Sequence, residues 1–153
     1  MSAVLKPQLA FRPMQMADLD AIMSIEPEIY PYPWSRGNFS DSISAGYSCW
    51  VFTQNDRIIG YGVLMSVLDE AHLLNLSIAR NEQGRGLGRT LLEHMMQLAR
   101  QHDALNLFLE VRPSNKVAIH LYDQIGFNEM AVRRGYYPAK DGRENAILMG
   151  LAL

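Results

Sequence analysis

The sequence predicts a single α/β domain of the α+β type, a mixed and mostly antiparallel sheet flanked by helices, in the order β-α-α-β-β-β-α-β-α-β-β. Three observations support this fold class. The chain has 153 residues, 48% hydrophobic and 20% charged, which is typical of one globular domain over residues 1–153. Segments of alternating apolar and polar residues indicate strands. Segments with apolar residues three and four apart indicate amphipathic helices between them.

The first half of the chain is expected to form a strand, two helices and a hairpin. These elements are a strand over 8–13, a helix over 16–30, a helix that begins after Ser35, and paired strands over 48–54 and 57–67. Pro27 should end or kink the first helix, because proline lacks the backbone N–H that a helix interior needs. The Ser35 hydroxyl is suited to cap the second helix.

The second half alternates strands with helices and ends in a pair of strands. The strands are expected over 70–80, 104–111, 128–137 and 144–151, and the helices after Gly88 and over 115–127. In the first of these strands, Leu74, Leu76 and Ile78 are expected on one face. Gly126 should close the last helix.

Three glycines occupy five positions at 84–88, directly before a segment with the apolar spacing of a helix. A helix N-terminus has unpaired N–H groups and the positive end of the helix dipole, and glycine lets a ligand approach that backbone. The segment therefore favours an anion such as phosphate, and a plain glycine turn is the alternative. Its spacing lacks the Gly-x-Gly-x-x-Gly of dinucleotide-binding folds and the Gly-Lys-Ser/Thr of a Walker loop.

Composition and charge argue against several classes of partner. The net charge of −2 and the pI near 6.1 give no basic surface for nucleic acid. There is no apolar run of about 18 residues and no signal-peptide stretch, so we expect a cytoplasmic protein without a membrane partner. A monomer is compatible with the sequence, which carries no sign of a particular oligomer. The single cysteine, Cys49, is expected to be buried in a strand and not to be a nucleophile.

The glycine loop and three other stretches resemble the Gcn5-related N-acetyltransferases. That family has a Q/R-x-x-G-x-G/A loop, matched here by Gln83, Gly86 and Gly88. The other stretches, at 32–35, 109–127 and 133–149, are similar to those of the bacterial ribosomal-protein-alanine N-acetyltransferases within the family. Four matches in the same order cover nearly the whole chain, which is far more specific than the glycine loop alone.

The resemblance implies acetyl-coenzyme A as the co-substrate and no metal. The coenzyme pyrophosphate would bind the backbone amides of Gly84, Arg85, Gly86, Leu87, Gly88 and Arg89. The pantetheine arm would pair with the backbone of Leu76, Ser77 and Ile78. Gln83 and Asn115 also match coenzyme-contacting positions of the family.

Acetyl transfer to an amine needs a base for the ammonium proton and an acid for the departing thiolate. Glu110 stands at the end of an apolar strand, where a carboxylate is costly unless it is used or paired, and it matches the family's catalytic glutamate. The alternative is a charge that emerges into solvent. Tyr122 shares a helix face with Asn115 and matches the family's general acid. The alternative for Tyr122 is a tyrosine packed in the core.

By the same resemblance, Trp34, Tyr136 and Tyr137 would form the walls of a groove for an acceptor peptide, with the two tyrosines in a loop. Packing against the core is the alternative for Trp34. The acidic residues at 18, 20, 26 and 28 would favour a basic acceptor or form an ordinary solvated helix face. The four histidines have no metal-ligand spacing.

The implied function is transfer of acetyl from acetyl-coenzyme A to the N-terminal α-amine of a protein, with alanine of the ribosomal protein bS18 as the expected acceptor. A lysine side chain or a small amine, such as a polyamine or an aminoglycoside, is the alternative acceptor. The alternative outside the enzymes is a module that binds an acyl-coenzyme A without turnover. The presence of both Glu110 and Tyr122 argues against that module.

Overall fold

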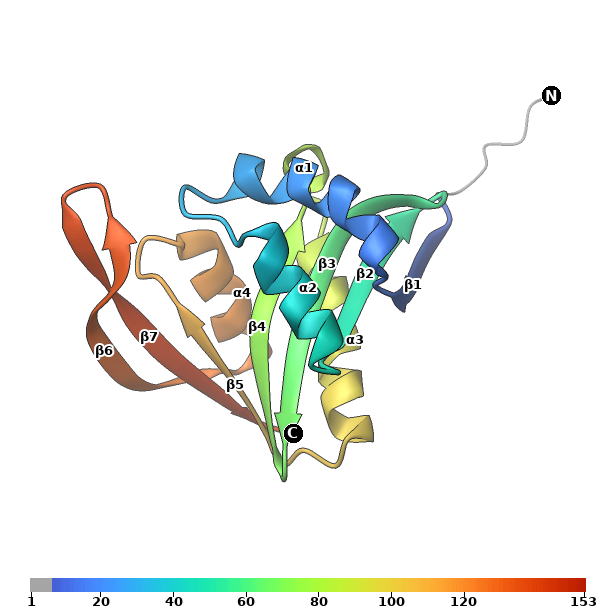
Figure 1. Ribbon diagram of the computed structural model, residues 1–153. Coiled ribbons are helices and arrows are strands. Elements are labelled where there is room, and N and C mark those ends of the chain that lie inside the picture. The colour runs from blue at the N-terminus through green and yellow to red at the C-terminus, as the bar shows by residue number, and fades with distance from the viewer. Residues whose placement is uncertain (1–6) are drawn as a thin grey trace.

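The structure is a computed structural model that describes residues 7–153 and contains one seven-stranded mixed sheet (Figure 1). Its elements are β1 (Leu9–Pro13), α1 (Leu19–Ile29), α2 (Arg36–Ser44), β2 (Ser48–Gln54), β3 (Arg57–Val67), β4 (Glu70–Ile78), α3 (Leu87–Gln101), β5 (Asn106–Val111), α4 (Lys116–Ile125), β6 (Asn128–Ala139) and β7 (Gly142–Ala152). This order confirms the predicted one. The first six residues, part of the N-terminal stretch considered for a signal peptide, lie outside the described residues.

The strands lie in the order β1-β2-β3-β4-β5-β7-β6. β4 and β5 are parallel, and the other neighbouring pairs are antiparallel. A parallel pair requires a crossover connection, which α3 provides. The glycine loop therefore lies between the end of β4 and the start of the crossover helix, at the centre of the sheet.

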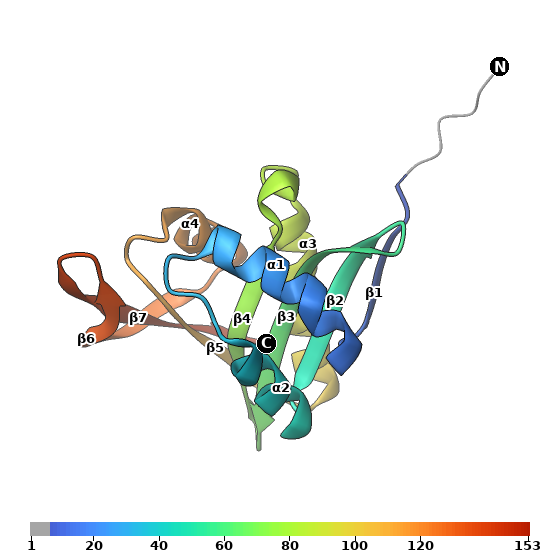
Figure 2. The same ribbon diagram turned by 45° about the horizontal axis from the view of Figure 1, so that its top comes forward.

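The helices cover the sheet on both faces, α1 and α2 on one and α3 and α4 on the other (Figures 1 and 2). The core under α1 and α2 includes Leu19, Ile22, Phe39, Val51, Tyr61 and Val63. The core under α3 and α4 includes Phe52, Leu64, Leu91, Leu92, Met95, Leu107 and Leu109. The apolar spacing of α3 in the sequence thus correctly predicted its buried face.

β4 and β5 pair at their beginnings and then separate. The parallel pairing covers Glu70–Leu73 on β4, which then runs on to Ile78. On the edge of β4 that faces β3, Leu73 and Asn75 pair with two successive residues of β3. Leu74, between them, therefore forms a bulge. A bulge bends a strand and re-aims its side chains, and bulges are common next to active sites. The two strands therefore form a V-shaped opening in the sheet (Figure 1).

The bulge also changes which side chains of β4 share a face. Leu76 and Ile78 pack against the core under α3, but Leu74 is 38% exposed. Asn75 and Ser77 are buried instead. The expectation that all three apolar residues lie on one face was therefore wrong for Leu74, because the sequence alone did not reveal the extra residue.

Two other local expectations differ from the structure. α1 continues past Pro27 to Ile29, since a proline in the last turn removes a single helical hydrogen bond. Tyr136 and Tyr137, expected in a loop, lie within β6, whose pairing with β7 is interrupted between Arg133 and Tyr137. β6 is an edge strand, where Pro138 is tolerated.

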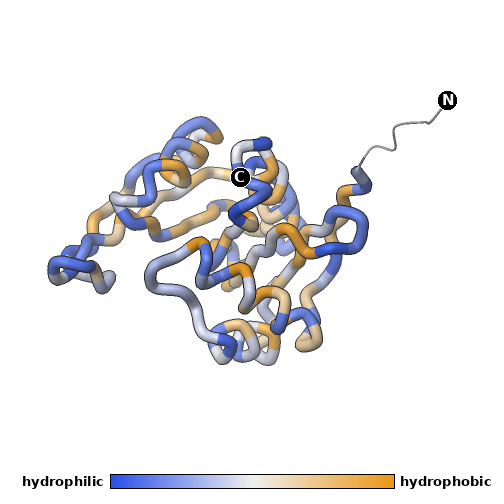
Figure 3. The backbone as a smooth tube through the Cα atoms, turned by 90° about the horizontal axis from the view of Figure 1, so that it is seen from above, coloured by the Kyte–Doolittle hydropathy of each residue, from blue (hydrophilic) through white to orange (hydrophobic). Residues whose placement is uncertain are grey.

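The polar and apolar segments follow this architecture. Seen from above, the outer end of the β6–β7 hairpin is hydrophilic, whereas apolar stretches concentrate on the inner strands (Figure 3). Over residues 7–153, no helix is long and apolar enough to cross a membrane.

Candidate active site

The glycine loop forms the N-terminus of α3. Gly84 and Gly86 have φ values of +79° and +75°, a left-handed conformation that other residues rarely adopt. Gly86 is the N-cap of α3, and no side chain caps the helix there. A Cβ built on either glycine would have nothing within 4 Å. The first amides of α3 are therefore open to a ligand, which is the arrangement that binds phosphate.

Side chains next to the loop fasten it to the sheet. Gln83 Nε2 donates to the Ile78 carbonyl at 3.0 Å. Glu82 is buried and forms ion pairs with Arg57, at 3.0 Å, and with Arg85. The Arg85 guanidinium therefore faces Glu82, and the geometry supports a coenzyme contact for its backbone rather than for its side chain.

The predicted pantetheine-binding stretch lies on the part of β4 that has left β5. The Leu76 carbonyl accepts a hydrogen bond from the Tyr30 hydroxyl at 3.0 Å, and the Ile78 carbonyl accepts one from Gln83. Each carbonyl oxygen has a second lone pair for another donor. Asn115 caps α4 by accepting from the Ala118 amide at 3.3 Å, which leaves the amide nitrogen of its side chain to donate.

A pocket of about 400 Å³ lies beside the V-shaped opening. Its lining comes from the α1–α2 loop and from β4, β5, β6 and β7. The lining residues are Trp34, His72, Leu73, Leu74, Phe108, Leu109, Glu110, Arg133, Tyr136, Tyr137 and Leu148. The structure therefore brings together all the residues that the sequence predicted for the acceptor, with the predicted base among them. This space is called the acceptor pocket below.

Glu110 has one engaged and one unengaged carboxylate oxygen. Its Oε1 lies 3.2 Å from Arg133 Nη2. Its Oε2 is buried and has no hydrogen-bond partner among the described residues. A buried carboxylate oxygen without a partner is costly unless a ligand or water completes it. This geometry favours a site residue over a charge that emerges into solvent.

Tyr122 is 7% exposed and packs against Phe127. Burial raises the pKa of the Tyr122 phenol, and the nearby phenols of Tyr30 and Tyr137 raise it further. The hydroxyl therefore stays protonated at neutral pH, as a proton donor must. The two interpretations from the sequence are compatible, because a packed ring leaves the hydroxyl available as a donor.

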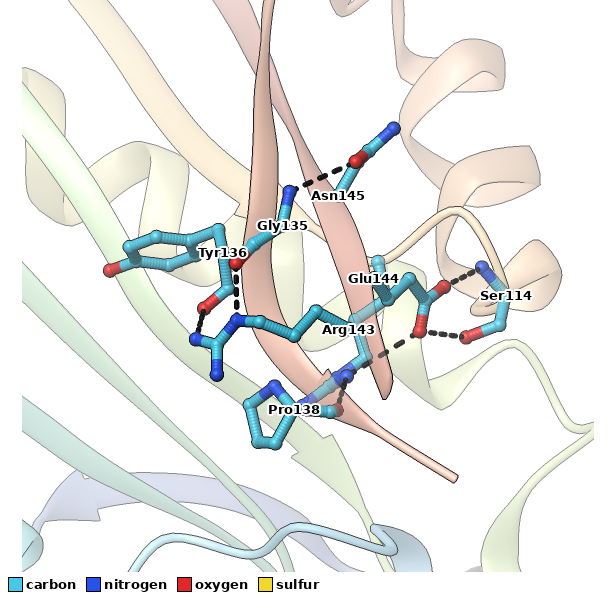
Figure 4. A network of polar contacts seen from close by, with 8 residues as sticks. Ser114, Gly135, Tyr136, Pro138, Arg143, Glu144 and Asn145 are labelled. Atoms are coloured by element: carbon cyan, nitrogen blue, oxygen red, sulfur yellow. Dashed lines mark hydrogen bonds and ion pairs between the residues drawn. The ribbon is translucent and has the colours of Figure 1, made fainter. Parts of the chain in front are cut away.

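Four residues connect the β6–β7 hairpin to the rest of the sheet (Figure 4). Glu144 accepts from the backbone amide of Ser114 at 2.7 Å and from its hydroxyl at 3.0 Å. Arg112 donates to the Pro138 carbonyl at 2.7 Å and lies 3.4 Å from Glu144. The Ser114 hydroxyl contributes most to lowering the pKa of Glu144. These contacts fix the strand that carries the two tyrosines.

Cations lie over the aromatic rings of the acceptor pocket. The guanidinium of Arg112 is 4.3 Å from the centre of the Tyr137 ring, and that of Arg133 is 4.6 Å from the centre of the Tyr136 ring. The two tyrosine rings meet edge to face at 4.9 Å. Burial, with the Glu110 charge second, raises the pKa of Tyr137 to about 12, so this phenol is neutral at physiological pH.

Trp34 forms the opposite wall. Its ring lies 5.0 Å from that of Phe39 in the core under α1 and α2. Its backbone amide donates to Glu26 Oε2 at 2.9 Å. Trp34 thus both packs against the core and lines this pocket, and the structure is compatible with either interpretation from the sequence.

Sequence reasoning missed three residues of this region. His72 lines the acceptor pocket and pairs with Glu70 at 3.2 Å, although the sequence had indicated no role for it. Arg133 contacts Glu110, and Glu26 anchors the Trp34 loop. The place of His72 depends on the register of β4 with β5, where residues 72 and 108 are partners, so no local pattern in the sequence marks it. The other two depend on contacts between distant segments.

The four acidic residues at 18, 20, 26 and 28 do not form one solvated helix face, which was one of their two interpretations, because Asp18 and Glu26 are buried. Asp18 pairs with an arginine at 2.8 Å, and this contact is the largest cause that lowers the pKa of Asp18. Asp20 also pairs with an arginine, and Glu26 is buried. Asp20, despite this pairing, and Glu28 are both exposed. Local acidity near residues 18–28 is therefore a weak basis for choosing a basic acceptor.

Cys49 is 6% exposed, and burial raises the pKa of its thiol to about 11. A protonated, buried thiol does not serve as a nucleophile, in agreement with the expectation from the sequence. Within residues 7–153, no group of three or more His, Cys, Asp or Glu side chains is arranged to hold a metal ion.

Comparison with known proteins identifies the family. Residues 19–127 match the model of the acetyltransferase (GNAT) family. The chain belongs to this family. It is 41% identical over 140 residues to the ribosomal protein bS18-alanine N-acetyltransferase of Escherichia coli strain K12. The aligned region covers 92% of this chain and 95% of that protein. The corresponding Haemophilus influenzae enzyme is 37% identical over 141 residues, covering 92% and 96%.

The solved structures agree with this assignment. The crystal structure of the ribosomal-protein-S18-alanine N-acetyltransferase from Escherichia coli matches this GNAT chain with a TM-score of 0.88 and 39% identity, covering 95% of this chain and 94% of that one. The predicted fold is therefore confirmed. The predicted enzyme class is confirmed as well: the chain is an acetyl-coenzyme A-dependent N-acetyltransferase.

Proposed function

We propose that this acetyltransferase modifies the N-terminal α-amine of a protein, with the N-terminal alanine of ribosomal protein bS18 as its acceptor. The carrying observation is the unpartnered Oε2 of Glu110 in a pocket walled by Trp34, Tyr136 and Tyr137. An ammonium group supplies the donors that this oxygen lacks. The 41% identity to the enzyme of that name supports the choice of acceptor. With a ribosomal protein as substrate, the cytoplasm is the expected compartment of the enzyme.

The backbone holds the coenzyme in this proposal. The open amides from Gly84 to Arg89, with the dipole of α3, bind the pyrophosphate. The freed edge of β4 at Leu76–Ile78 aligns the pantetheine arm, so that the thioester lies in the V-shaped opening. Asn115 donates to the same arm from the start of α4. These contacts need no side-chain charge, in keeping with the pairing of Arg85 to Glu82.

Glu110 and Tyr122 carry the protons. Glu110 takes the proton from the ammonium group, directly or through one water, so that the nitrogen lone pair attacks the thioester carbonyl carbon. The C–N bond forms and the C–S bond breaks. Tyr122 then supplies a proton to the sulfur that leaves with the C–S electron pair. The second proton that the nitrogen loses as the amide forms restores the Tyr122 phenol, directly or through water. No covalent enzyme intermediate is required.

The choice of an α-amine follows from acidity and shape. An α-amine has a reference pKa near 7.7 to 8.0 and a lysine near 10.4, so a carboxylate base activates the α-amine more readily. The walls formed by Trp34 and the two tyrosines accommodate one extended chain end. A folded loop that presents a lysine is bulkier on both sides of the reacting nitrogen.

The test is to incubate the enzyme with acetyl-coenzyme A and a peptide that begins with alanine and contains an internal lysine. Fragmentation mass spectrometry then locates the acetyl group. We expect acetyl on the α-amine alone, and no product from the same peptide with a formylated N-terminus. Acetyl mainly on lysine, or turnover with spermidine but not with the peptide, would replace this proposal by the corresponding acceptor class.

A further inference from the structure

Glu26 is a buried carboxylate that the chemistry of acetyl transfer does not use. It lies in the last turn of α1 and is 1% exposed. Among the described residues, no lysine, arginine or histidine lies within ion-pairing distance of it. A carboxylate buried without a cation is retained only where hydrogen bonds compensate for its lost hydration.

Every partner of Glu26 is a donor. The Tyr61 hydroxyl donates to Oε1 at 2.7 Å, and Asn75 Nδ2 donates to the same oxygen at 3.4 Å. The Trp34 backbone amide donates to Oε2 at 2.9 Å. Burial and the Glu26 charge raise the pKa of Tyr61, so its phenol keeps the donated proton. A carboxylate is the group that accepts from all three donors at once.

These contacts join the wall of the acceptor pocket to the strand at its base. Asn75 Oδ1 accepts from the Ser77 hydroxyl at 2.6 Å. The Ser77 hydroxyl lies 3.0 Å from that of Tyr30, which donates to the Leu76 carbonyl at 3.0 Å. Through Asn75, hydrogen bonds thus connect the backbone of Trp34 to the part of β4 that has separated from β5.

The Trp34 loop has few other attachments. Residues 31 and 33 are prolines, which have no backbone N–H to donate. The Trp34 ring packs on Phe39, but a ring contact alone leaves the backbone free to shift. Elsewhere in the loop, the Arg112 guanidinium lies 5.0 Å from the centre of the Tyr32 ring. The bond to Glu26 is the hydrogen bond that links the Trp34 backbone itself to the core.

We propose that Glu26 is a positioning residue for the acceptor, acting through the Trp34 backbone to hold one wall of the acceptor pocket at the correct distance from Glu110. This inference rests on the proposed function, because it takes Trp34 as an acceptor wall. A purely structural role for Glu26 is the competing explanation. The two differ in which kinetic constant changes and in whether the change depends on Trp34.

The main variant is Glu26→Gln, which keeps the shape but replaces one acceptor oxygen by a donor nitrogen. We expect the KM for the alanine-initiated peptide to rise at least about tenfold, while kcat and the dissociation constant for acetyl-coenzyme A stay within about threefold. Tyr61→Phe is the matched control, because it removes one Glu26 partner and leaves the bond to Trp34. Its peptide KM should stay within about threefold of wild type.

A double-mutant cycle tests whether Glu26 acts through Trp34. Trp34→Ala should raise the peptide KM, and adding Glu26→Gln to it should change that KM little further, because coupled residues are non-additive. Independent, multiplying effects would overturn the proposal, as would a Glu26→Gln enzyme with an unchanged peptide KM. If Glu26→Gln does not fold, Glu26→Asp takes its place, since its carboxylate is one methylene short of Trp34.

The anisotropy of Trp34 fluorescence, in a Trp50→Phe background, gives a readout that does not depend on the acceptor. We expect Glu26→Gln to lower it, and equal anisotropy would contradict the proposal. Failure of the proposed function would show differently, as a wild-type enzyme that does not acetylate the peptide α-amine. In that case the anisotropy and the cycle, repeated with the amine that wild type accepts, decide the role of Glu26.

Discussion

The coenzyme loop and the acceptor pocket are built in opposite ways. The loop is one continuous segment, and its recognition groups are backbone amides exposed by Gly84 and Gly86. The acceptor pocket combines side chains from five separate segments, held by ion pairs, cation–π contacts and the buried Glu26. In the proposed function, local backbone geometry would bind the coenzyme. Long-range side-chain contacts would shape the pocket for the acceptor.

The difference has a consequence for mutations. A substitution in the loop should change coenzyme binding and leave acceptor selection intact. A substitution in the acceptor pocket should do the reverse, and only the proton carriers should reduce turnover with both substrates bound. The predictions below follow this division, from the largest expected effect to the smallest.

Glu110→Gln should lower kcat by about a hundredfold to ten-thousandfold, the range for a general base. The loss should be largest at low pH. Below the α-amine pKa of about 7.7, the neutral amine falls about tenfold per pH unit, and the variant has no base to restore it. A pH–rate profile checks this, with Glu129→Gln, at an exposed carboxylate of β6, as the matched control. Wild-type rates across the profile would remove Glu110 from the mechanism.

Gly86→Val should weaken acetyl-coenzyme A binding by at least about a hundredfold, or about 2.8 kcal/mol. A branched side chain disfavours the positive φ of +75° and blocks approach to the amides. Calorimetric titration measures the change. Gly46→Val is the matched control, because Gly46 has a φ of +79° and open space at its Cβ but lies outside the loop. Equal losses in both variants would attribute the effect to strain alone.

Tyr122→Phe should lower kcat by about tenfold to a hundredfold with unchanged coenzyme binding, because it removes the proton for the thiolate and keeps the packed ring. Single-turnover kinetics with saturating substrates isolate this step. Loss of coenzyme binding in parallel with turnover would show that Tyr122 shapes the channel instead.

Arg112→Gln should raise the acceptor KM by about threefold to tenfold, since it removes the cation from Tyr137 and one contact to Pro138. The coenzyme dissociation constant should not change. Steady-state kinetics, in which each substrate is varied in turn, distinguish an effect on the acceptor from an effect on the coenzyme. Arg100→Gln, on the exposed side of α3, serves as the control. An equal increase for both substrates would contradict the division between the two regions.

Asp18→Asn lies outside both regions and should affect stability alone. The pairing with Arg12 lowers the folded-state pKa of Asp18, so its stabilisation is present above the ordinary pKa near 3.9 and is lost as pH falls through the folded value. We expect the variant to have a Tm about 2–4 °C lower than wild type at pH 7. This value is kept small because solvent screens the partly exposed Arg12 partner and weakens the ion pair. The difference should shrink toward pH 3. A difference that persists there would exclude the ion pair as its cause.

The same division explains what the sequence could predict. Apolar periodicity located α3 and its buried face, and the glycines marked its N-terminus, because both signals are local. The bulge at Leu74 was missed, since it depends on how β3 and β5 pair with β4. Tyr136 and Tyr137 were expected in a loop, because Gly135 and Pro138 flank them, yet the pairing of β6 with β7 extends past both.

The acceptor pocket was predictable only in part. Family resemblance pointed to Trp34 and to the two tyrosines, and the structure places them around Glu110. Glu26 was taken for one of several acidic residues on a helix surface. Its burial depends on Tyr61 and Asn75, which are 35 and 49 residues away in the chain. No local pattern carries such a contact.

Calorimetric titration of acetyl-coenzyme A into a protein with Trp34, Tyr136 and Tyr137 all replaced by alanine tests the division most directly. Because the proposal assigns the coenzyme to backbone groups of the loop and of β4, we predict a dissociation constant within about threefold of wild type, less than about 0.7 kcal/mol. Acetylation of the alanine-initiated peptide by the same variant should be lost. Loss of coenzyme binding along with it would show that the two regions are one site and would contradict the account.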